Sequence, residues 1–421
     1  MNKQQQQLSP SLLKQLGIDK TKIRKVETLE EIVKDPPLMV TAQVKHDATW
    51  QTGSGPLKIH KGSTLVMPLS QFMSTRRTTD NRKSILKPYR HPFHKLFRRY
   101  RGQEMHGKRL LIWRGGGFGD LCFLMPIMKH IKKLYPTCQI TVASYPRFVP
   151  IYADFPPGLI ENVLPVPFSA NFLYNHHYHL TFEGAIERCI EAQNVNVYDL
   201  FSKVAGFDID FTDDYYKLEL YPNEKILEEF KNILPENFVV VQMRASSPIR
   251  MMSDSKWANI IKRIIDLDKK VVFIDRPDLH EYYLNFIKKY NLDVTKVRSF
   301  CSKCKHINHG VAIISKSDGV VAIDSAFTHI GVALNKPVVG IYGSFKGWLR
   351  MKYYKNADWI DAEDKVCQFQ PCFFHHDEKI KCPSIKNKKC PACLETINED
   401  LIIEKFKKLI LKEDNNDRRE S

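Results

Sequence analysis

The chain has 421 residues, which is too long for one hydrophobic core and indicates at least two domains. Apolar residues make up 43% and charged residues 26%, as in soluble globular proteins, and no run of 18 apolar residues could cross a bilayer. The first residues, MNKQQQQLSPSLLKQLG, lack the basic start and long apolar centre of a secretory signal. These features exclude a mini-protein and a membrane span, and we expect a cytoplasmic protein.

The net charge of +17 is concentrated near the N-terminus. Residues 1–109 carry 22 basic and 8 acidic side chains, so the rest of the chain is close to neutral. Residues 76–101 alone hold ten basic residues against Asp80, interleaved with four aromatic rings. Such a segment suits a polyanion, either nucleic acid, a phosphorylated glycolipid or an anionic membrane surface, because each neutralised phosphate releases counterions. A solvated basic linker that packs against the rest of the protein is the alternative.

Four segments follow from the pattern of the sequence. Residues 1–107 form a basic extension, in which the short strand-like runs of 38–70 around the turn TGSGP predict a small β module. Residues 108–235 begin with a strand, a glycine-rich turn, a helix and a second strand. The alternation of strands and helices begins again in residues 236–398 with the apolar run FVVVQM. Residues 399–421 read as a terminal helix and a polar tail. The fold class is therefore α/β, with two Rossmann-like domains that face a cleft.

The glycine-rich turn RGGGFGD follows the strand at 110–113. Its glycines, Gly115, Gly116, Gly117 and Gly119, allow a sharp turn and a close approach to a ligand, and the helix after them presents N–H groups to an anion. The turn is not the dinucleotide fingerprint, because Asp120 stands where the third glycine belongs. Asp120 either caps the helix or, if it faces the cleft, takes a proton from an attacking hydroxyl.

Two further motifs follow strands of the second domain. Ser246, Ser247 and Arg250 in MRASSPIR come after the first strand, where open α/β sheets bind ligands, and hydroxyls with a guanidinium suit a diphosphate. A polar loop with an N-cap serine is the alternative. In IDSAFTHIGVALNKPVVGIYG, Asp324 and Ser325 end a strand and His329 lies one helical turn later. A histidine in such a helix is usually a half-buried residue with a hydrogen-bond partner.

Ten cysteines in a cytoplasmic protein favour metal or redox chemistry over disulfides. Five of them lie close together in residues 367–393, the last two as CPAC. Cys372, Cys382, Cys390 and Cys393 could complete a tetrahedral zinc site of thiolates, although their spacing is less regular than in a zinc ribbon. Structural thiols without a metal are an equal alternative.

Three motifs give the chain, from about 108 to 411, a resemblance to the glycosyltransferase family 9 group, the ADP-heptose:lipopolysaccharide heptosyltransferases. The motif GD-x5-P is present as Gly119, Asp120 and Pro126. The serine-rich loop A-S-x-P-x-R/K is present as Ala245, Ser246, Pro248 and Arg250. The third motif, D-[ST]-x3-H-x3-A-x3-P, matches Asp324, Ser325, His329, Ala333 and Pro337.

The resemblance implies a GT-B fold and an inverting, metal-independent transfer of a heptose-like sugar from an ADP-heptose-like nucleotide sugar to a glycan or glycolipid acceptor. No cofactor is then required for catalysis, and a structural zinc is the only metal expected. By motif position the first Rossmann-like domain binds the acceptor, and Asp120 is the general base. The donor contacts are Ser246, Ser247, Arg250, Asp324, Ser325 and His329. Asp275, which ends the strand VVFID, is expected to bind nucleoside hydroxyls by analogy with other α/β sites.

The extension of residues 1–107 has no counterpart in a typical family member and leaves the acceptor open. Lipopolysaccharide or surface-glycan synthesis is the expected process. A sugar transferase that acts on modified nucleic acid and grips phosphates through residues 76–101 is one alternative. The other is a catalytically inactive module that binds a sugar nucleotide in the cleft.

Overall fold

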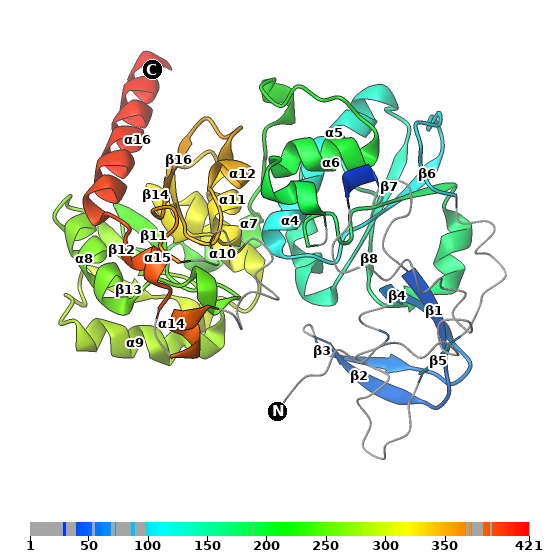
Figure 1. Ribbon diagram of the computed structural model, residues 1–421, viewed down its shortest axis with the longest axis horizontal. Helices are drawn as coiled ribbons and strands as arrows, with labels where there is room; N and C mark the ends of the chain where they lie inside the picture. The colour runs from blue at the N-terminus through cyan, green and yellow to red at the C-terminus, as the bar shows by residue number, and fades with distance from the viewer. Residues whose placement is uncertain are drawn as a thin grey trace.

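A computed structural model describes residues 28–30, 39–52, 55–68, 72, 86–88, 98–187, 189–367, 370, 372, 382–387 and 390–420. Most of the basic segment 76–101 lies outside these residues. Two lobes lie side by side, and strands from the N-terminal extension lie beneath one of them (Figure 1). No helix among the described residues is long and apolar enough to span a membrane.

The first lobe is built on a parallel sheet with the strand order β10–β6–β7–β8. Its strands are β6 (Arg109–Trp113), β7 (Gln139–Ser144), β8 (Asn162–Pro165) and β10 (Tyr178–Thr181). Apolar residues of β6 and β7 are buried, because helices cover the sheet on one side and a cluster with Val66 of the extension and Phe168 packs on the other. The helices of this lobe are α4 (Phe118–Cys122), α5 (Leu124–Leu134), the 3-10 helix η3 (Pro146–Asp154) and α6 (Val197–Ala205).

The second lobe contains a six-stranded parallel sheet with the order β13–β12–β11–β14–β15–β16. The strands are β11 (Phe238–Gln242), β12 (Lys270–Phe273), β13 (Val297–Ser299), β14 (Gly319–Ile323), β15 (Val338–Tyr342) and β16 (Ala357–Asp361). In both lobes the chain order along the sheet reverses next to the first strand, between β6 and β10 and between β11 and β14. Open α/β sheets bind ligands at such switch points, so two candidate loop clusters follow from the topology.

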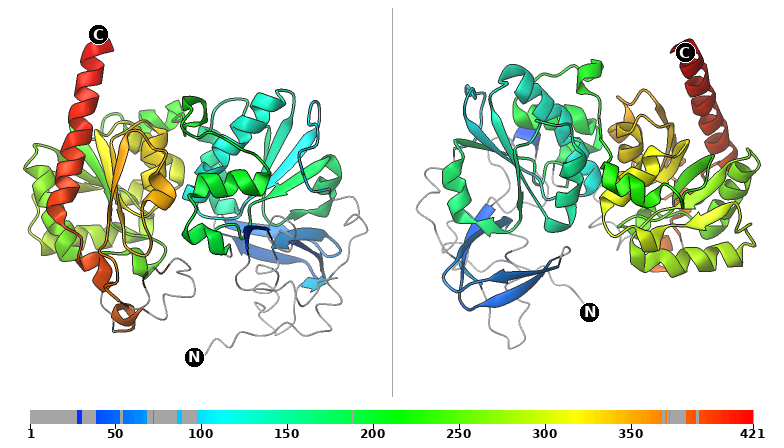
Figure 2. Two further views of the ribbon diagram at one scale, coloured as in Figure 1. Left: turned by 45° about the horizontal axis from the view of Figure 1, so that its top comes forward. Right: turned by 180° about the vertical axis from the view of Figure 1, so that it is seen from behind.

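Helices flank the second sheet, and Figure 2 shows them on both of its faces. They are α7 (Glu224–Phe230), α8 (Asp254–Ile265), α9 (His280–Lys289), α10 (Ile307–Ser315), α11 (Ala326–Ala333), α12 (Trp348–Met351), α14 (Pro383–Lys386), α15 (Ala392–Glu395) and α16 (Glu399–Glu420). The terminal helix continues to Glu420, so it includes residues that the sequence pattern predicts as a polar tail. The added residues contain neither Gly nor Pro, so nothing in the sequence stops the helix there.

The extension forms two small antiparallel sheets. One has the order β5 (Leu86–Pro88), β1 (Met39–Val44), β4 (Thr64–Pro68) and β9 (Phe168–Ser169), and the other pairs β2 (Ala48–Thr52) with β3 (Gly55–Ile59). Strand β9 comes from the first lobe, so the extension shares a sheet with it. In addition, Arg99 bridges to His179 at the edge of β10, and Tyr100 is buried. The extension is therefore built into the first lobe.

Candidate active site

The loop after β6 places Asp120 at the switch point of the first lobe. Asp120 lies in the first turn of α4, and its Oδ2 accepts a hydrogen bond from the N–H of Gly117 at 2.9 Å and an ion pair from Arg114 at 2.6 Å. Among the described residues, no hydrogen bond or ion pair engages Oδ1. The carboxylate thus caps the helix with one oxygen and keeps the other for a further partner.

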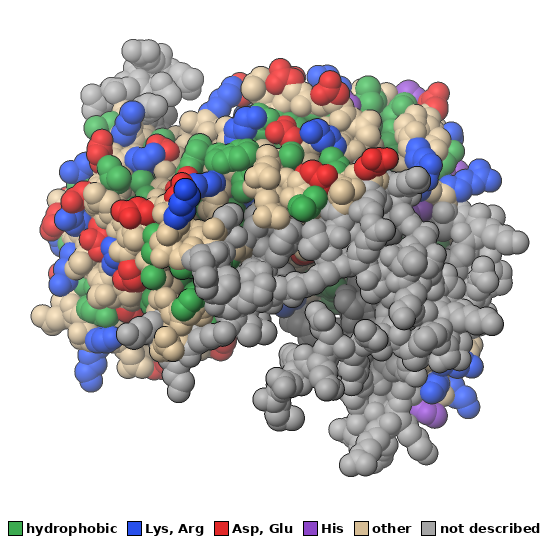
Figure 3. Space-filling view, viewed as in Figure 1, with side chains coloured by type: hydrophobic (Ala, Val, Ile, Leu, Met, Phe, Trp, Pro, Cys, Tyr) green, Lys and Arg blue, Asp and Glu red, His purple; other side chains and the backbone are tan. Residues whose placement is uncertain are grey.

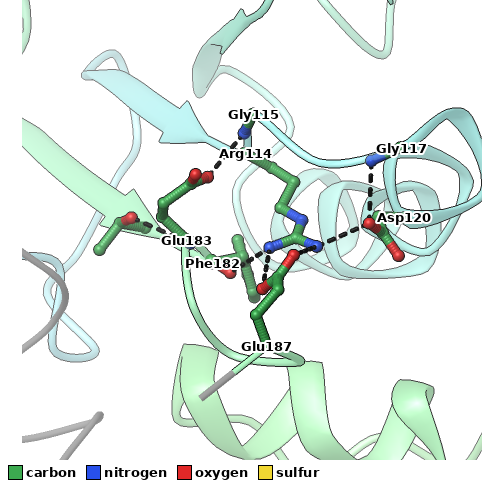
Figure 4. Close-up of polar contacts among 8 residues, drawn as sticks. Arg114, Gly115, Gly117, Asp120, Phe182, Glu183 and Glu187 are labelled. Atoms are coloured by element: carbon green, nitrogen blue, oxygen red, sulfur yellow. Dashed lines mark hydrogen bonds and ion pairs between the residues drawn. The ribbon is translucent and has the colours of Figure 1, made fainter. Parts of the chain in front are cut away.

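Arg114 is the last residue before the glycines and is completely buried. Its Nη1 donates to the carbonyl oxygen of Phe182 at 3.1 Å and to Glu187 at 2.9 Å, and its Nη2 donates to Glu187 at 2.7 Å as well as to Asp120. Glu183 accepts a hydrogen bond from the N–H of Gly115 at 2.8 Å (Figure 4). The loops that follow β6 and β10 therefore form one charged cluster, which we call the Arg114 cluster: Arg114, Asp120, Glu183 and Glu187.

The electrostatics of the Arg114 cluster separate its carboxyl groups. Burial raises the pKa of Asp120, but the charge of Arg114 and the hydrogen bonds from Gly117 and Arg114 outweigh it, so the pKa lies below its usual value. Burial raises the pKa of Glu183, and the nearby Glu187 and Asp120 raise it further against the charge of Arg114. Asp120 is therefore the stably ionised group of the two at neutral pH.

The glycines of the loop accommodate protein side chains at close range. A Cβ at Gly119 would lie 2.6 Å from Cδ2 of His329, and one at Gly116 would lie 2.5 Å from Nε of Arg114. At Gly117 the nearest such atom is 3.8 Å away. None of these glycines has a positive φ, so close packing, and not an unusual backbone conformation, requires glycine at positions 116 and 119.

The second cluster lies at the switch point of the second lobe, where loops follow β11 and β14. Nη1 of Arg250 donates to Oδ2 of Asp324 at 3.0 Å and to the backbone carbonyl oxygen of Asp324 at 2.8 Å. Nη2 donates to Oγ of Ser246 at 2.6 Å. The structure thus brings Asp324 to Ser246 and to Arg250, which lies 74 residues earlier in the sequence. We call these residues, with Ser247 and Ser325, the Arg250 cluster.

Several polar atoms of the Arg250 cluster have no partner among the described residues. They are Oγ of Ser247, Oγ of Ser325 and Nε of Arg250, and all three are buried. Buried polar groups are almost always hydrogen-bonded, so three such groups at one switch point indicate a place for a ligand that accepts hydrogen bonds.

His329 connects the two clusters. It lies on α11 and is buried, and its ring packs edge-on against Phe123 of the first lobe with ring centres 4.7 Å apart. Its Nδ1 is 2.8 Å from the hydroxyl of Tyr354. Burial lowers the pKa of His329 to about 4, so the ring is neutral at neutral pH. A neutral ring packs between the lobes without the cost of a buried charge.

Arg350 on α12 also lies in this region. It is buried, and burial lowers its pKa, while attraction to Asp324 and Asp120 opposes this effect. The motifs did not single out Arg350, Arg114, Glu183 or Glu187. The only signal for Arg114 was a charged residue at the end of the apolar strand LLIW, and the other three have no local signal.

Asp275 follows β12 at the same edge of the sheet. Its Oδ1 accepts from the N–H of Arg276 at 2.8 Å, and its Oδ2 accepts from the hydroxyl of Tyr283 at 3.1 Å and from Gln242 at 3.3 Å. Burial raises its pKa, although these hydrogen bonds lower it in part. Because the protein already occupies both oxygens, a nucleoside contact at Asp275 stays a prediction.

The cysteines of residues 367–393 fall into the described part of the chain. Cys372 and Cys382 are buried and pack with Ile249 beside the Arg250 cluster, and Cys393 lies near Cys367 and Cys382. Within the described residues, no group of three or more His, Cys, Asp or Glu side chains is arranged to hold a metal ion. The geometry therefore adds no support for zinc at Cys372, Cys382, Cys390 and Cys393. Zinc stays a prediction, which metal analysis of the purified chain would decide.

Two parallel α/β sheets with facing switch points are the architecture of GT-B glycosyltransferases. Residues 176–370 match the sequence model described as Glycosyltransferase family 9 (heptosyltransferase). No curated protein sequence matches it.

Solved structures support the fold at low sequence identity. The glycosyltransferase family 9 structure from Veillonella parvula is 15% identical, with a TM-score of 0.55, over 74% of this chain and 99% of that one. The Escherichia coli ADP-heptose LPS heptosyltransferase II is 15% identical, with a TM-score of 0.54, over 73% and 99%. The iron-containing dodecameric glycosyltransferase TibC from enterotoxigenic E. coli is 14% identical, with a TM-score of 0.52, over 89% and 92%.

The share covered by TibC bears on the N-terminal extension. The match with TibC covers 89% of this chain, which is more than residues 108–421 alone contain. The structural likeness therefore continues into residues 1–107. The expectation concerned a typical family member, and the Veillonella and E. coli structures, each matched over 99% of its own length, cover only 74% and 73% of this chain. The apolar pattern could not reveal this likeness, because at 14% identity it is one of backbone arrangement.

Proposed function

We propose that the chain transfers a heptose-like sugar from an ADP-linked donor to a hydroxyl of a glycan or glycolipid, with inversion at the anomeric carbon and without a catalytic metal ion. The observation that carries this proposal is the Arg250 cluster, in which three buried polar atoms have no partner in the described part of the chain, at the switch point of the second sheet. The name of the similar E. coli enzyme supports ADP-heptose as the first donor to test.

Each lobe supplies one half of the reaction. Oδ1 of Asp120 accepts the proton of the acceptor hydroxyl while the hydroxyl oxygen forms a bond with the anomeric carbon. The bond between that carbon and the diphosphate breaks, and the leaving nucleoside diphosphate takes the electron pair. The guanidinium of Arg250 and the hydroxyls of Ser247 and Ser325 stabilise the charge that develops there. Arginine supplies the positive charge that this step requires, so the proposal needs no metal ion.

The test separates donor binding from turnover. Calorimetry with ADP-heptose, ADP-glucose and UDP-glucose measures binding, and release of ADP measures turnover in water or with an added acceptor. We expect Asp120→Asn to keep donor binding and to lower ADP release by about 10²-fold or more. Arg250→Ala should weaken binding, whereas Arg263→Ala, an arginine on the surface of α8, should leave it unchanged.

Three outcomes would contradict the proposal in different ways. Absence of binding to every ADP sugar would exclude the donor class. Binding without any ADP release would indicate a sugar-nucleotide-binding module. Equal turnover of the wild type and Asp120→Asn would remove the role of Asp120. The acceptor class and the cytoplasmic location remain predictions that need separate experiments with isolated glycans and with cell fractions.

A further inference from the structure

The Arg114 cluster contains a cation that the proposed chemistry does not use directly. Arg114 is completely buried, and its Nη1 and Nη2 are shared between two carboxylates and one carbonyl oxygen. Glu187 binds it through both of its oxygens, but Asp120 binds it through Oδ2 only. The contact with Asp120 spans six residues of sequence and the contact with Glu187 spans 73.

This geometry fixes one carboxylate more tightly than a helix cap does. The N–H of Gly117 and Nη2 of Arg114 hold the same oxygen of Asp120 from two sides, which turns Oδ1 away from the guanidinium (Figure 4). The side chain of Asp120 is 23% exposed, whereas that of Arg114 is 0% exposed. Asp120 can therefore meet a substrate, and Arg114 can act only through Asp120.

Glu187 competes with Asp120 for the guanidinium of Arg114. If Arg114 served Asp120 alone, the carboxylate would be paired with a full positive charge and would be a weak base. Glu187 takes two of the four hydrogen bonds of the guanidinium and compensates its charge. Its side chain is 33% exposed, so it lies at the edge of the cluster and not in the core.

We propose that Arg114 is a positioning residue that orients Asp120 for proton transfer, and that Glu187 sets the basicity of Asp120 by sharing the guanidinium. The inference rests on the proposed function of Asp120 as the base. Arg114 stands in the same glycine-rich turn after β6 as Asp120, whereas Glu187 comes from the loop after β10, so no local motif contains all three residues.

Other titratable groups face Asp120, and their charges must be the same in all variants that are compared. Arg350 approaches from α12 and Glu183 from the loop after β10. His329 approaches from α11, and Cys122 lies on the same helix as Asp120. Burial raises the pKa of Cys122 to about 12 and lowers that of His329 to about 4, so Cys122 stays neutral where Asp120 titrates, whereas His329 titrates in the same acid range. Arg350 stays charged there, which leaves Glu183 and His329 as the neighbours to be controlled by Glu183→Gln and His329→Gln.

The direct test is a titration of Asp120 in the full chain. Selective ¹³C labelling of aspartate carboxyl carbons gives its NMR signal, and Asp120→Asn assigns that signal by difference. We expect Arg114→Met to raise the pKa of Asp120 by about one to three units and Glu187→Gln to lower it, because one variant removes a positive charge and the other a negative charge. Arg114→Lys should give an intermediate value. Arg109→Met, at the exposed opposite end of β6, should change nothing.

The second measurement is the pH profile of ADP release from ADP-heptose. The acid limb should move to higher pH in Arg114→Met and to lower pH in Glu187→Gln, and Arg114→Met should lower kcat more than it changes KM. A purely structural role predicts lower activity with unshifted limbs, and that result would overturn the proposal. Should Arg114→Met fail to fold, Glu187→Gln and Arg114→Lys still decide the direction of the shift.

The two proposals fail in different ways. If the wild type releases no ADP from any donor, the proposed function fails, but the NMR titration still reports on the Arg114 cluster. If the wild type is active and Asp120→Asn is not, while the titration of Asp120 is the same in all variants, only the role of Arg114 and Glu187 is excluded.

Discussion

The contact between Gly119 and His329 joins residues of different lobes. An alanine at position 119 would place its Cβ 2.6 Å from the imidazole, which is buried and held by Tyr354. We expect Gly119→Ala to destabilise the protein by about 1–3 kcal/mol, because the ring cannot move away without opening its packing against Phe123. Urea unfolding measures this cost, and calorimetry with ADP-heptose shows whether donor binding weakens with it.

Gly117→Ala is the matched control for this prediction. The added Cβ would have its nearest neighbour at 3.8 Å, and the φ of Gly117 suits an L-residue, so we expect little change. His329→Ala combined with Gly119→Ala should recover part of the loss, because it removes the atom that clashes. Equal effects of the two glycine substitutions would show that the clash with His329 is unimportant.

The residues of the site differ in how far the sequence could reveal them. Ser246, Ser247 and Arg250 lie within five positions of one another, and Asp324 and Ser325 are adjacent, so a local motif brings out each group. Arg114 and Glu187 meet only through the pairing of β6 with β10. A contact that depends on strand order leaves no local pattern in the sequence. For this reason the Arg114 cluster was not predicted.

At the scale of the element, buried parallel strands are the most predictable part of the fold. The strands β6, β7, β11, β12, β14 and β15 are apolar runs because both faces of each sheet are covered. The strands β8 and β16 have mostly half-exposed side chains, so no apolar run marks them. The pairing of β4 with β9, which attaches the extension to the first lobe, joins segments about 100 residues apart and is equally invisible in the sequence.

The attachment of the extension can be tested at Tyr100. Its side chain is 2% exposed and packs near Phe207, while its N–H donates to the carbonyl oxygen of His179 at 2.8 Å. We expect Tyr100→Ala to lower the free energy of unfolding of the first lobe by about 3–5 kcal/mol, because it leaves a cavity in the core. Urea unfolding followed by tryptophan fluorescence measures the change.

Arg101 provides the control, because the next residue along the chain is exposed. Arg101→Ala should leave the unfolding midpoint unchanged although it removes one positive charge from the basic segment. A small effect of Tyr100→Ala would mean that residues 98–107 contribute little to the first lobe, and the extension would then be a separate appendage.

At the scale of the whole molecule, charge and stability have different origins. Acidic and basic side chains alternate over the described surface of the second lobe, in keeping with the nearly neutral composition beyond residue 109 (Figure 3). The excess of positive charge therefore belongs to the N-terminal part of the sequence. Buried polar pairs contribute to the contact between the lobes, together with the packing of His329 against Phe123.

Asp154 and Asn308 form such a pair between the lobes. Asp154 ends η3, is fully buried, and accepts a hydrogen bond from Nδ2 of Asn308 on α10 at 2.6 Å. Burial raises the pKa of Asp154 to about 6. Between about pH 4 and pH 6 the folded state thus binds more protons at this site than the unfolded state. Stability contributed by this group is present at acid pH and is lost as the pH rises through 6.

We therefore expect Asp154→Asn to flatten the dependence of stability on pH. Asparagine stays neutral and keeps an oxygen for Asn308, so the variant should avoid the loss between pH 4.5 and pH 7.5. This loss amounts to about 2 kcal/mol, because the unfolded state has already released most of its proton at pH 4.5. Urea unfolding at both pH values measures this difference, with Asp208→Asn as the control at an exposed aspartate. Wild-type and Asp154→Asn profiles that run parallel would show that Asp154 ionises freely in the folded protein and that this contact between the lobes does not sense pH.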